Sequence, residues 1–223
     1  LSIGKNQDSF SVVTETAAFP NLGLKTVKEL MPGEIVFINQ AGLQVKKKGK
    51  KSNLKICAFL WIYTGFPASC YQGINVEKVR ENCGRCLARA DKIKPDLVAG
   101  VPDSGTAHAV GYALERGAPF RRPLVKYTPG YGRSYFPSYQ SIRDLVARMK
   151  LIPIKEIIKN QKIVLCDDSF VRGTQLKNYT LAKLWKNKAK EVHIRVACPP
   201  LLFPCEFNYS TRTKKELVAR RAI

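Results

Sequence analysis

The chain has 223 residues, 45% of them hydrophobic, and its formal net charge is +21. This length suffices for one substantial domain, or for one domain and part of another, and the composition excludes wholesale disorder. No apolar run approaches the roughly 20 residues that cross a bilayer, and no signal-peptide pattern is present. We therefore expect a cytoplasmic protein with no membrane contact.

The positive charge attracts phosphate-bearing partners of any kind. Part of it lies in one run, Lys46-Lys47-Lys48-Gly49-Lys50-Lys51, which we interpret as a solvated turn rather than a nucleic-acid contact. The other basic residues are spread through expected helices without a recognition-helix or stacking-aromatic pattern. A nucleic-acid partner is therefore not expected, although the charge does not exclude one.

Residues 1–53 have the texture of strands and turns. The pattern predicts strands at Phe10–Thr16, Glu34–Asn39 and Leu43–Val45, with a short helix at Leu22–Leu30 between them. These elements are too few to close a core alone, so we interpret this region as the end of a domain.

Residues 54–223 form a second region, in which strand-like and helix-like segments alternate. The expected strands are Ile56–Tyr63, Asp96–Val101, Leu124–Lys126, Lys162–Cys166 and Glu191–Ala197. The expected helices are Val76–Ala90, Gly105–Arg116, Tyr139–Lys150 and Thr174–Lys186. Such alternation predicts an α/β domain with a mainly parallel sheet, whose ligands bind at the carboxyl ends of the strands.

The loop after strand Lys162–Cys166 is the strongest candidate site. Asp167 and Asp168 can hold sugar hydroxyls or Mg²⁺, and the segment Ser169–Thr174 offers hydroxyls and helix-start amides to a phosphate. Gly173 allows close approach of the backbone. Composition alone is equally compatible with a helix cap preceded by two surface acids.

A second loop, Val101–Thr106, also joins a strand to a helix. Ser104, Gly105 and Thr106 are suited to an anion site. Taken alone, the loop is better explained as an ordinary N-cap, with Ser104 or Asp103 as the capping residue.

The third loop, Lys126–Arg133, contains two glycines and a proline. Its terminal cations, Lys126 and Arg133, could close over a polyphosphate and exclude water. A flexible surface loop explains the composition equally well.

Together these segments resemble the glutamine phosphoribosylpyrophosphate (PRPP) amidotransferases, and the likeness runs in collinear order over nearly the whole chain. The segments that carry it are Val98–Gly105, Gly111–Ala113, Val146–Leu151, Val164–Thr174, Ala189–Arg195 with Pro199-Pro200, Phe203–Cys205 and Thr213–Leu217. The resemblance implies a type I phosphoribosyltransferase fold over residues 54–223. Segments Leu1–Lys5, Val13–Thr16 and Pro32–Val36 look like the closing strands of the family's N-terminal-nucleophile glutaminase domain. Residues 1–53 would be a partial copy of that domain.

By this resemblance, the chain takes part in de novo purine biosynthesis. It would displace pyrophosphate from C1 of PRPP with ammonia, giving 5-phosphoribosylamine. Asp167 and Asp168 would hold the ribose hydroxyls and Mg²⁺, and Ser104 would be a further Mg²⁺-linked residue. The 5′-phosphate would bind at Ser169–Thr174, which includes Val171, Arg172 and Gly173, and pyrophosphate at Pro102–Gly105, which includes Asp103. Lys126 and Arg133 would act from the closing loop. The resemblance also implies a homo-oligomer and makes purine nucleotides candidate feedback inhibitors.

The chain departs from the family pattern in several places. Its closing loop, Lys126–Arg133, is one residue longer and lacks an inner arginine, which puts pyrophosphate activation in doubt. Phe66-Pro-Ala-Ser69 stands where the family commonly has Arg-Pro-Asp-Ser. The chain begins with Leu1, where the glutaminase domain needs a cysteine at its mature N-terminus, so we do not expect glutamine hydrolysis.

The seven cysteines are odd in number and irregularly spaced, which favours reduced thiols over a disulfide framework. Cys57 and Cys205 fall at two ligand positions of the family's [4Fe–4S] cluster, and a complete cluster is not expected in this chain. Cys83 and Cys86 have the spacing of a ligand pair, but we interpret them as thiols in or near the buried face of a helix. His108 and His193 are interpreted as structural.

Two other functions remain open. The first is a non-catalytic module with a phosphoribosyltransferase fold that senses PRPP or nucleotides and binds nucleic acid through its charge. The second is a truncated, inactive paralogue.

Overall fold

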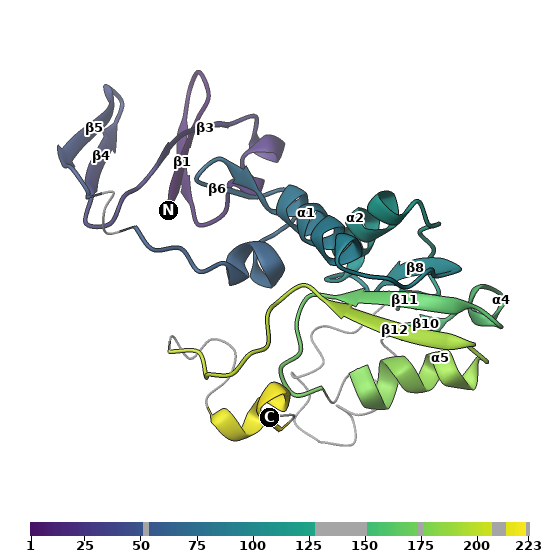
Figure 1. Cartoon of the computed structure of the whole chain (residues 1–223). Helices are drawn as coiled ribbons and strands as arrows, with labels where there is room; N and C mark the ends of the chain where they lie inside the picture. The colour runs from purple at the N-terminus through teal and green to yellow at the C-terminus, as the bar shows by residue number, and fades with distance from the viewer. Residues whose placement is uncertain (51–53, 128–150, 174–175, 207–212, 222–223) are drawn as a thin grey trace. The chain divides into compact units, whose positions relative to one another are not determined.

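The computed structural model describes residues 1–50, 54–127, 151–173, 176–206 and 213–221. The chain forms two compact units, Leu1–Val79 and Arg80–Ile223, which we call the N-terminal unit and the C-terminal unit. Figure 1 shows the first in purple to blue and the second in teal to yellow.

Short antiparallel strands make up most of the N-terminal unit. Three of them form a sheet in the order β2-β1-β3, and two further pairs are hairpins. The strands are β1 Ser2–Lys5, β2 Phe10–Val13, β3 Lys25–Glu29, β4 Ile35–Asn39, β5 Gly42–Lys47, β6 Cys70–Tyr71 and β7 Ile74–Asn75. Two 3₁₀ turns, Thr16–Ala18 and Pro20–Leu22, lead into β3.

The helix predicted over Leu22–Leu30 is wrong. Its residues Lys25–Glu29 form β3, which pairs antiparallel with β1. The β-branched Thr26 and Val27 suit an extended chain, and β1 offers them a partner that a local pattern cannot reveal.

The strand predicted over Ile56–Tyr63 is also wrong. The chain forms a π-helical turn at Leu60–Thr64 instead. The amide of Gly65 closes the turn by donating to the Leu60 carbonyl at 2.7 Å. A short apolar run does not distinguish a strand from a helical turn by periodicity alone, which explains the error.

Residues that follow this turn are bound to the strands of the N-terminal unit. The Glu15 carboxylate accepts a hydrogen bond from the Ser69 hydroxyl at 2.8 Å, and the Glu29 carboxylate accepts one from the Gln72 amide nitrogen at 2.7 Å. The compact unit therefore extends to Val79. The boundary predicted after residue 53 separates a glutaminase-like segment from a phosphoribosyltransferase-like domain, and it stays a prediction.

A parallel sheet in the order β12-β11-β8 forms the centre of the C-terminal unit. Its strands are β8 Leu97–Gly100, β11 Lys162–Asp167 and β12 Glu191–Val196, and an antiparallel pair consists of β9 Leu124–Lys126 and β10 Leu151–Pro153. The helices are α1 Val76–Arg89, α2 Thr106–Arg116, α4 Lys155–Ile158, a π-helical segment Leu176–Leu181 that runs into α5 Ala182–Lys186, and two 3₁₀ turns, Lys214–Glu216 and Val218–Arg221. The predicted α/β class is confirmed. The helix expected at Tyr139–Lys150 lies outside the described residues.

Strand β11 carries the hydrophobic core on both of its faces. Val164 and Cys166 pack in one cluster with Tyr112 of α2, while Ile163 and Leu165 pack in another with Leu184 of α5. All six of these side chains are completely buried. The alternation follows from the period of two in a strand, and it places helices on both faces of the sheet, as Figure 1 shows.

Helices α1 and α2 approach each other closely at two glycines. A Cβ on Gly84 would lie 1.9 Å from the His108 carbonyl oxygen, and a Cβ on Gly111 would lie 1.9 Å from the Glu81 carbonyl oxygen. No side chain fits at such distances, so glycine is required at both positions for the helices to pack.

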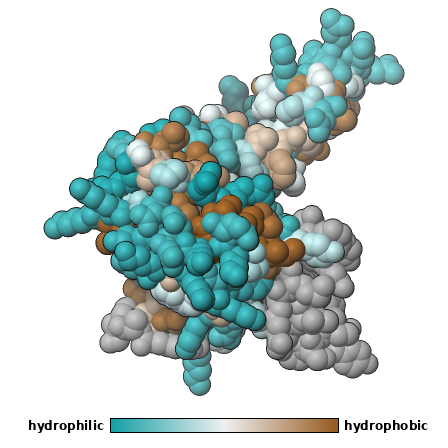
Figure 2. All heavy atoms as spheres, turned by 90° about the vertical axis from the view of Figure 1, so that its right-hand side faces the viewer, coloured by the Kyte–Doolittle hydropathy of each residue, from teal (hydrophilic) through white to brown (hydrophobic). Residues whose placement is uncertain are grey.

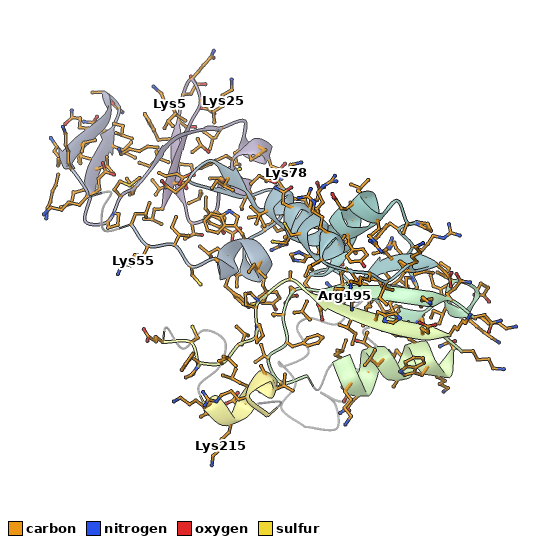
Figure 3. The ribbon with its side chains drawn as sticks, viewed as in Figure 1. Lys5, Lys25, Lys55, Lys78, Arg195 and Lys215 are labelled. Atoms are coloured by element: carbon orange, nitrogen blue, oxygen red, sulfur yellow. The ribbon has the colours of Figure 1, made fainter. Side chains whose placement is uncertain are left out.

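Arg195 of β12, labelled in Figure 3, ties this layer together through one carboxylate. Its Nε donates to Asp91 Oδ2 at 2.5 Å, and the hydroxyl of Tyr112 donates to the same oxygen at 2.6 Å. The hydrogen bond from Arg195 holds the pKa of Asp91 well below its usual range. This network joins the end of α1 to α2 and to β12.

Candidate active site

The two loops predicted to bind ligand lie against each other. β8 and β11 are neighbours, with Gly100 opposite Cys166, and the amide of Val101 donates to the Cys166 carbonyl at 2.9 Å. A Cβ on Gly105 would lie 2.3 Å from the same carbonyl oxygen. Glycine at position 105 is therefore required for the first loop to pass over the end of β11.

Two carboxylates and a hydroxyl meet at this edge of the sheet. Asp167 ends β11, and its carboxylate accepts a hydrogen bond from the side chain of Ser104 in the neighbouring loop. Asp168 is buried, and its Oδ1 accepts a hydrogen bond from the Ser169 hydroxyl at 2.5 Å. The three residues predicted to bind Mg²⁺ thus lie at one place.

The electrostatics of this pair favour a bound cation. Desolvation first, and the adjacent Asp168 carboxylate second, raise the pKa of Asp167. Two neighbouring carboxylates away from bulk water repel each other, and a cation between them relieves that cost. Carboxylate and hydroxyl oxygens are hard donors of the kind Mg²⁺ prefers, so these residues fit the predicted metal. Within the described residues, no group of three or more His, Cys, Asp or Glu side chains is placed to hold a metal ion; a Mg²⁺ site here would draw its remaining ligands from substrate and water.

The backbone of the acidic pair is anchored to the chain that leaves β12. The Asp167 carbonyl accepts the amide of Ala197 at 3.0 Å, and the Asp168 carbonyl accepts the amide of Cys198 at 2.8 Å. These bonds continue the hydrogen-bond ladder between β11 and β12 into the loop. They hold in place the backbone that carries the two carboxylate side chains.

The interpretation of the first loop as an ordinary N-cap is wrong. The N-cap of α2 is Gly105, and no side chain caps the helix. The Ser104 side chain instead donates a hydrogen bond to the Asp167 carboxylate. Asp103 forms an ion pair with Lys126, with Oδ2 2.6 Å from Nζ. Both side chains that could have capped the helix are therefore directed to candidate site residues.

Lys126 joins the third candidate loop to the first through this ion pair. It ends β9, and its side chain is 35% exposed, whereas that of Asp103 is 74% exposed. An ion pair this exposed is readily exchanged for contacts to another anion. Arg133, the other cation predicted in this loop, lies outside the described residues, so its role stays a prediction.

The segment predicted to hold the 5′-phosphate is supported by a distant part of the chain. The amide of Val218 donates to the Val171 carbonyl at 2.8 Å, and Arg172 forms an ion pair with Glu216, Nε to Oε2 3.1 Å. Gly173 has a φ of +72°, a conformation that glycine adopts without strain. Thr174 lies outside the described residues.

Sequence reasoning missed this support. Glu216 lies 44 residues beyond Arg172, and no local pattern announces the contact. The segment Thr213–Leu217 contributed to the family resemblance, but nothing in it indicated which loop it would touch. Leu217 is only 1% exposed, and its burial holds the segment in place.

The cysteines and histidines are placed mostly as structural residues. Cys83 is half-buried and burial raises the pKa of its thiol, but Cys86 is exposed, so its prediction near the buried face of α1 is wrong. His108 is buried with Nδ1 3.1 Å from the Arg80 carbonyl oxygen, and His193 pairs with Glu191 at 2.9 Å. Cys57 in the N-terminal unit is exposed and Cys205 in the C-terminal unit is half-buried. Their assignment as cluster positions stays a prediction.

Within the described residues, no helix is long and apolar enough to cross a membrane.

Comparison with known proteins gives a consistent result. No protein-family profile matches the chain. The amidophosphoribosyltransferase of Bacillus subtilis is 36% identical over 219 residues, which cover 98% of this chain and 46% of that protein. The amidophosphoribosyltransferase of Archaeoglobus fulgidus is 34% identical, over 98% of this chain and 48% of that protein.

Solved structures agree. The glutamine PRPP amidotransferase of B. subtilis, determined with ADP and GMP, superposes with a TM-score of 0.85 at 36% identity, over 98% of this chain and 48% of that one. A structure described as the allosteric regulatory enzyme of purine biosynthesis gives a TM-score of 0.86 over 98% of this chain and 47% of that one.

In both sequence and fold, the chain is similar to the amidophosphoribosyltransferases over 98% of its length, so the predicted resemblance is confirmed. It spans about half the length of the relatives that it matches.

Proposed function

We propose that this chain binds PRPP with Mg²⁺ at the carboxyl ends of β8 and β11 and transfers the phosphoribosyl group to ammonia. The observation that carries the proposal is the meeting of Ser104 with Asp167 and Asp168 at one edge of the sheet. In parallel sheets that edge is where ligands bind, and the relatives whose names describe this chemistry match over 98% of the chain.

The reaction breaks the bond between C1 of the ribose and the pyrophosphate oxygen and forms a bond between C1 and nitrogen. The transition state resembles an oxocarbenium ion, so positioning and charge stabilisation matter more than a single acid or base. Mg²⁺, when bound, neutralises charge that develops on the departing pyrophosphate.

The residues of the chain divide this work. Asp167 and Asp168 hold the ribose hydroxyls and the metal, and Ser104 orients the Asp167 carboxylate from the neighbouring loop. The first loop, Pro102–Gly105, binds pyrophosphate. Lys126 supplies a cation beside them once its contact with Asp103 is exchanged for the ligand.

The 5′-phosphate binds at the loop that begins with Ser169. Gly173 there adopts a left-handed backbone, which presents successive amides to an anion. The contacts of Val218 and Glu216 to this loop keep it in shape without ligand.

The decisive test follows pyrophosphate release from PRPP in the presence of Mg²⁺ and an ammonium salt. We expect release by the unaltered chain and a loss of about 10²-fold or more in Asp168→Asn, because that change removes a charge at the reacting sugar. Asp8→Asn, the same chemical change at an exposed position of the N-terminal unit, should leave the rate unaltered.

Two outcomes would contradict the proposal. An Asp168→Asn variant as active as the unaltered chain would remove the acidic pair from the site. A chain that binds PRPP with Mg²⁺ but releases no pyrophosphate would be a non-catalytic sensor of PRPP or nucleotides. ADP and GMP, present in the B. subtilis structure, are the nucleotides to add when inhibition is measured.

Nitrogen supply is tested separately. Replacing ammonium by glutamine in the same assay checks the expectation that this chain does not use glutamine. Sedimentation of the chain with and without nucleotide checks the proposed homo-oligomer.

A further inference from the structure

Three loops lie side by side at the amino ends of the parallel strands. The amide of Asp96, before β8, donates to the Lys162 carbonyl at 2.9 Å. The amide of Asn160, before β11, donates to the Lys188 carbonyl at 2.8 Å, and that of Lys190 donates to the Gln161 carbonyl at 2.9 Å. These bonds bring together segments that are up to 94 positions apart in sequence, from 96 to 190.

Lysines dominate these loops and the short helices beside them. The exposed ones include Lys94, Lys155, Lys159, Lys186, Lys188 and Lys190. We call this set, together with Trp185, the amino-end face. Within the described residues, none of these six lysines forms an ion pair with a carboxylate.

The acids of this region offset only part of the charge. Glu191 is shared between Lys162, at 3.3 Å, and His193, at 2.9 Å. Asp96 accepts the amide of Lys162 at 2.7 Å. Asp91, in the loop before β8, is paired with Arg195, and Glu156 is the remaining acid within the loops and helices that carry the six lysines. The region therefore keeps a positive excess.

An aromatic side chain lies among the lysines. Trp185, next to Lys186 at the end of α5, is 49% exposed, and its carbonyl accepts the amide of Lys188 at 2.9 Å. An exposed indole beside lysines offers a flat surface for stacking a base while the ammonium groups contact phosphates.

We propose that the amino-end face binds single-stranded nucleic acid. Lysines from three loops match a flexible phosphate backbone, and Trp185 matches a base. Figure 2 looks from the side where α4 lies in Figure 1, and it shows many hydrophilic residues around a hydrophobic patch near its centre.

This face is separate from the candidate active site. β11 runs from Lys162 to Asp167, so the lysine loops lie at its start and the acidic pair at its end. A strand of this length spans roughly 20 Å. The proposal therefore does not depend on the catalytic one, and both ligands can be bound at once.

The test measures fluorescence anisotropy of a labelled oligouridylate of about twelve nucleotides across a salt series. The variant Lys159→Glu/Lys188→Glu/Lys190→Glu should lose at least about tenfold in affinity and show a shallower salt dependence. The matched control is Lys46→Glu/Lys47→Glu/Lys48→Glu, which changes the net charge equally but in the N-terminal unit. It should lose less than about threefold.

Trp185 gives a second, independent measurement. Its fluorescence should be quenched by the oligonucleotide, and Trp185→Ala should weaken binding about five- to tenfold whereas Trp185→Phe retains it. Pyrophosphate release from PRPP, or PRPP binding, reports in each variant that the C-terminal unit is folded.

Three results would overturn the proposal. The first is equal loss of affinity in the two triple variants, which would show a diffuse effect of net charge. The second is Trp185→Ala binding as tightly as the unaltered chain. The third is that the same lysines bind vesicles rich in anionic lipid while the chain does not bind the oligonucleotide. That result would make the face a membrane-binding surface.

Discussion

Strand β11 of the C-terminal unit and strand β4 of the N-terminal unit use similar apolar residues with opposite results. In the C-terminal unit, the four consecutive residues Ile163–Cys166 of β11 are completely buried between helices. In the N-terminal unit, Ile35 and Phe37 of β4 are 55% and 50% exposed. The difference shows that a β-strand's contribution to stability depends on the layers that cover it, and the candidate site lies at the end of the covered strand β11.

The largest expected change in stability is at the crossing of α1 and α2, in the C-terminal unit. Gly111→Ala places a methyl group 1.9 Å from the Glu81 carbonyl oxygen, so the helices must separate. We expect a loss of more than about 3 kcal/mol in the free energy of unfolding, measured by denaturant titration.

The matched change in the N-terminal unit is Gly33→Ala. Gly33 has a φ of +73° and open space around it, so the cost should be only the conformational one, about 1 kcal/mol. Equal losses in the two variants would mean that the close approach of the helices does not govern stability.

A second pair of changes compares the two kinds of strand directly. Leu165→Ala removes a completely buried side chain of β11 and should cost about 3 kcal/mol, whereas Phe37→Ala removes a half-exposed one and should cost less than about 1 kcal/mol. A larger loss for Phe37→Ala, again by denaturant titration, would break the comparison.

The smallest effect concerns the pH dependence of stability. The raised pKa of Asp167 means that the folded chain keeps this proton at pH values where the unfolded chain has lost it. The free energy that Asp167 contributes to folding is therefore fully present below its ordinary pKa of about 4. It is lost as the pH rises through the raised pKa.

In Asp167→Asn this loss should be absent. Without Mg²⁺, we expect the variant to have a higher Tm than the unaltered chain at pH 8.5 and a nearly equal one at pH 4.5. Adding Mg²⁺ should raise the Tm of the unaltered chain alone. Asp8→Asn is the control, and a Tm difference that does not depend on pH would contradict the electrostatic explanation.

Much of the C-terminal unit was predictable because its local signals agree. The run at Lys162–Cys166 is β-branched and apolar and is followed at once by two acids, so both the strand and its functional end could be predicted. The segment Leu124–Lys126 was predicted with its observed bounds.

The failures have two physical causes. Lys25–Glu29 is extended because β1 pairs with it, and the Ile56–Tyr63 run bends because a short apolar segment satisfies its backbone equally well in a turn. The direction of Ser104 toward Asp167 and the clustering of lysines on the amino-end face also depend on neighbours distant in sequence. Local patterns carry no information about such neighbours.

The contact between Val218 and Val171 has a consequence for how the site is made in the cell. A ribosome delivers the acidic pair long before it delivers Glu216 and Val218. The loop proposed to bind the 5′-phosphate therefore lacks its contacts with Glu216 and Val218 until these residues have emerged from the ribosome. The proposed PRPP site is in this sense complete only after these residues have been made, when the strands beneath it are already present.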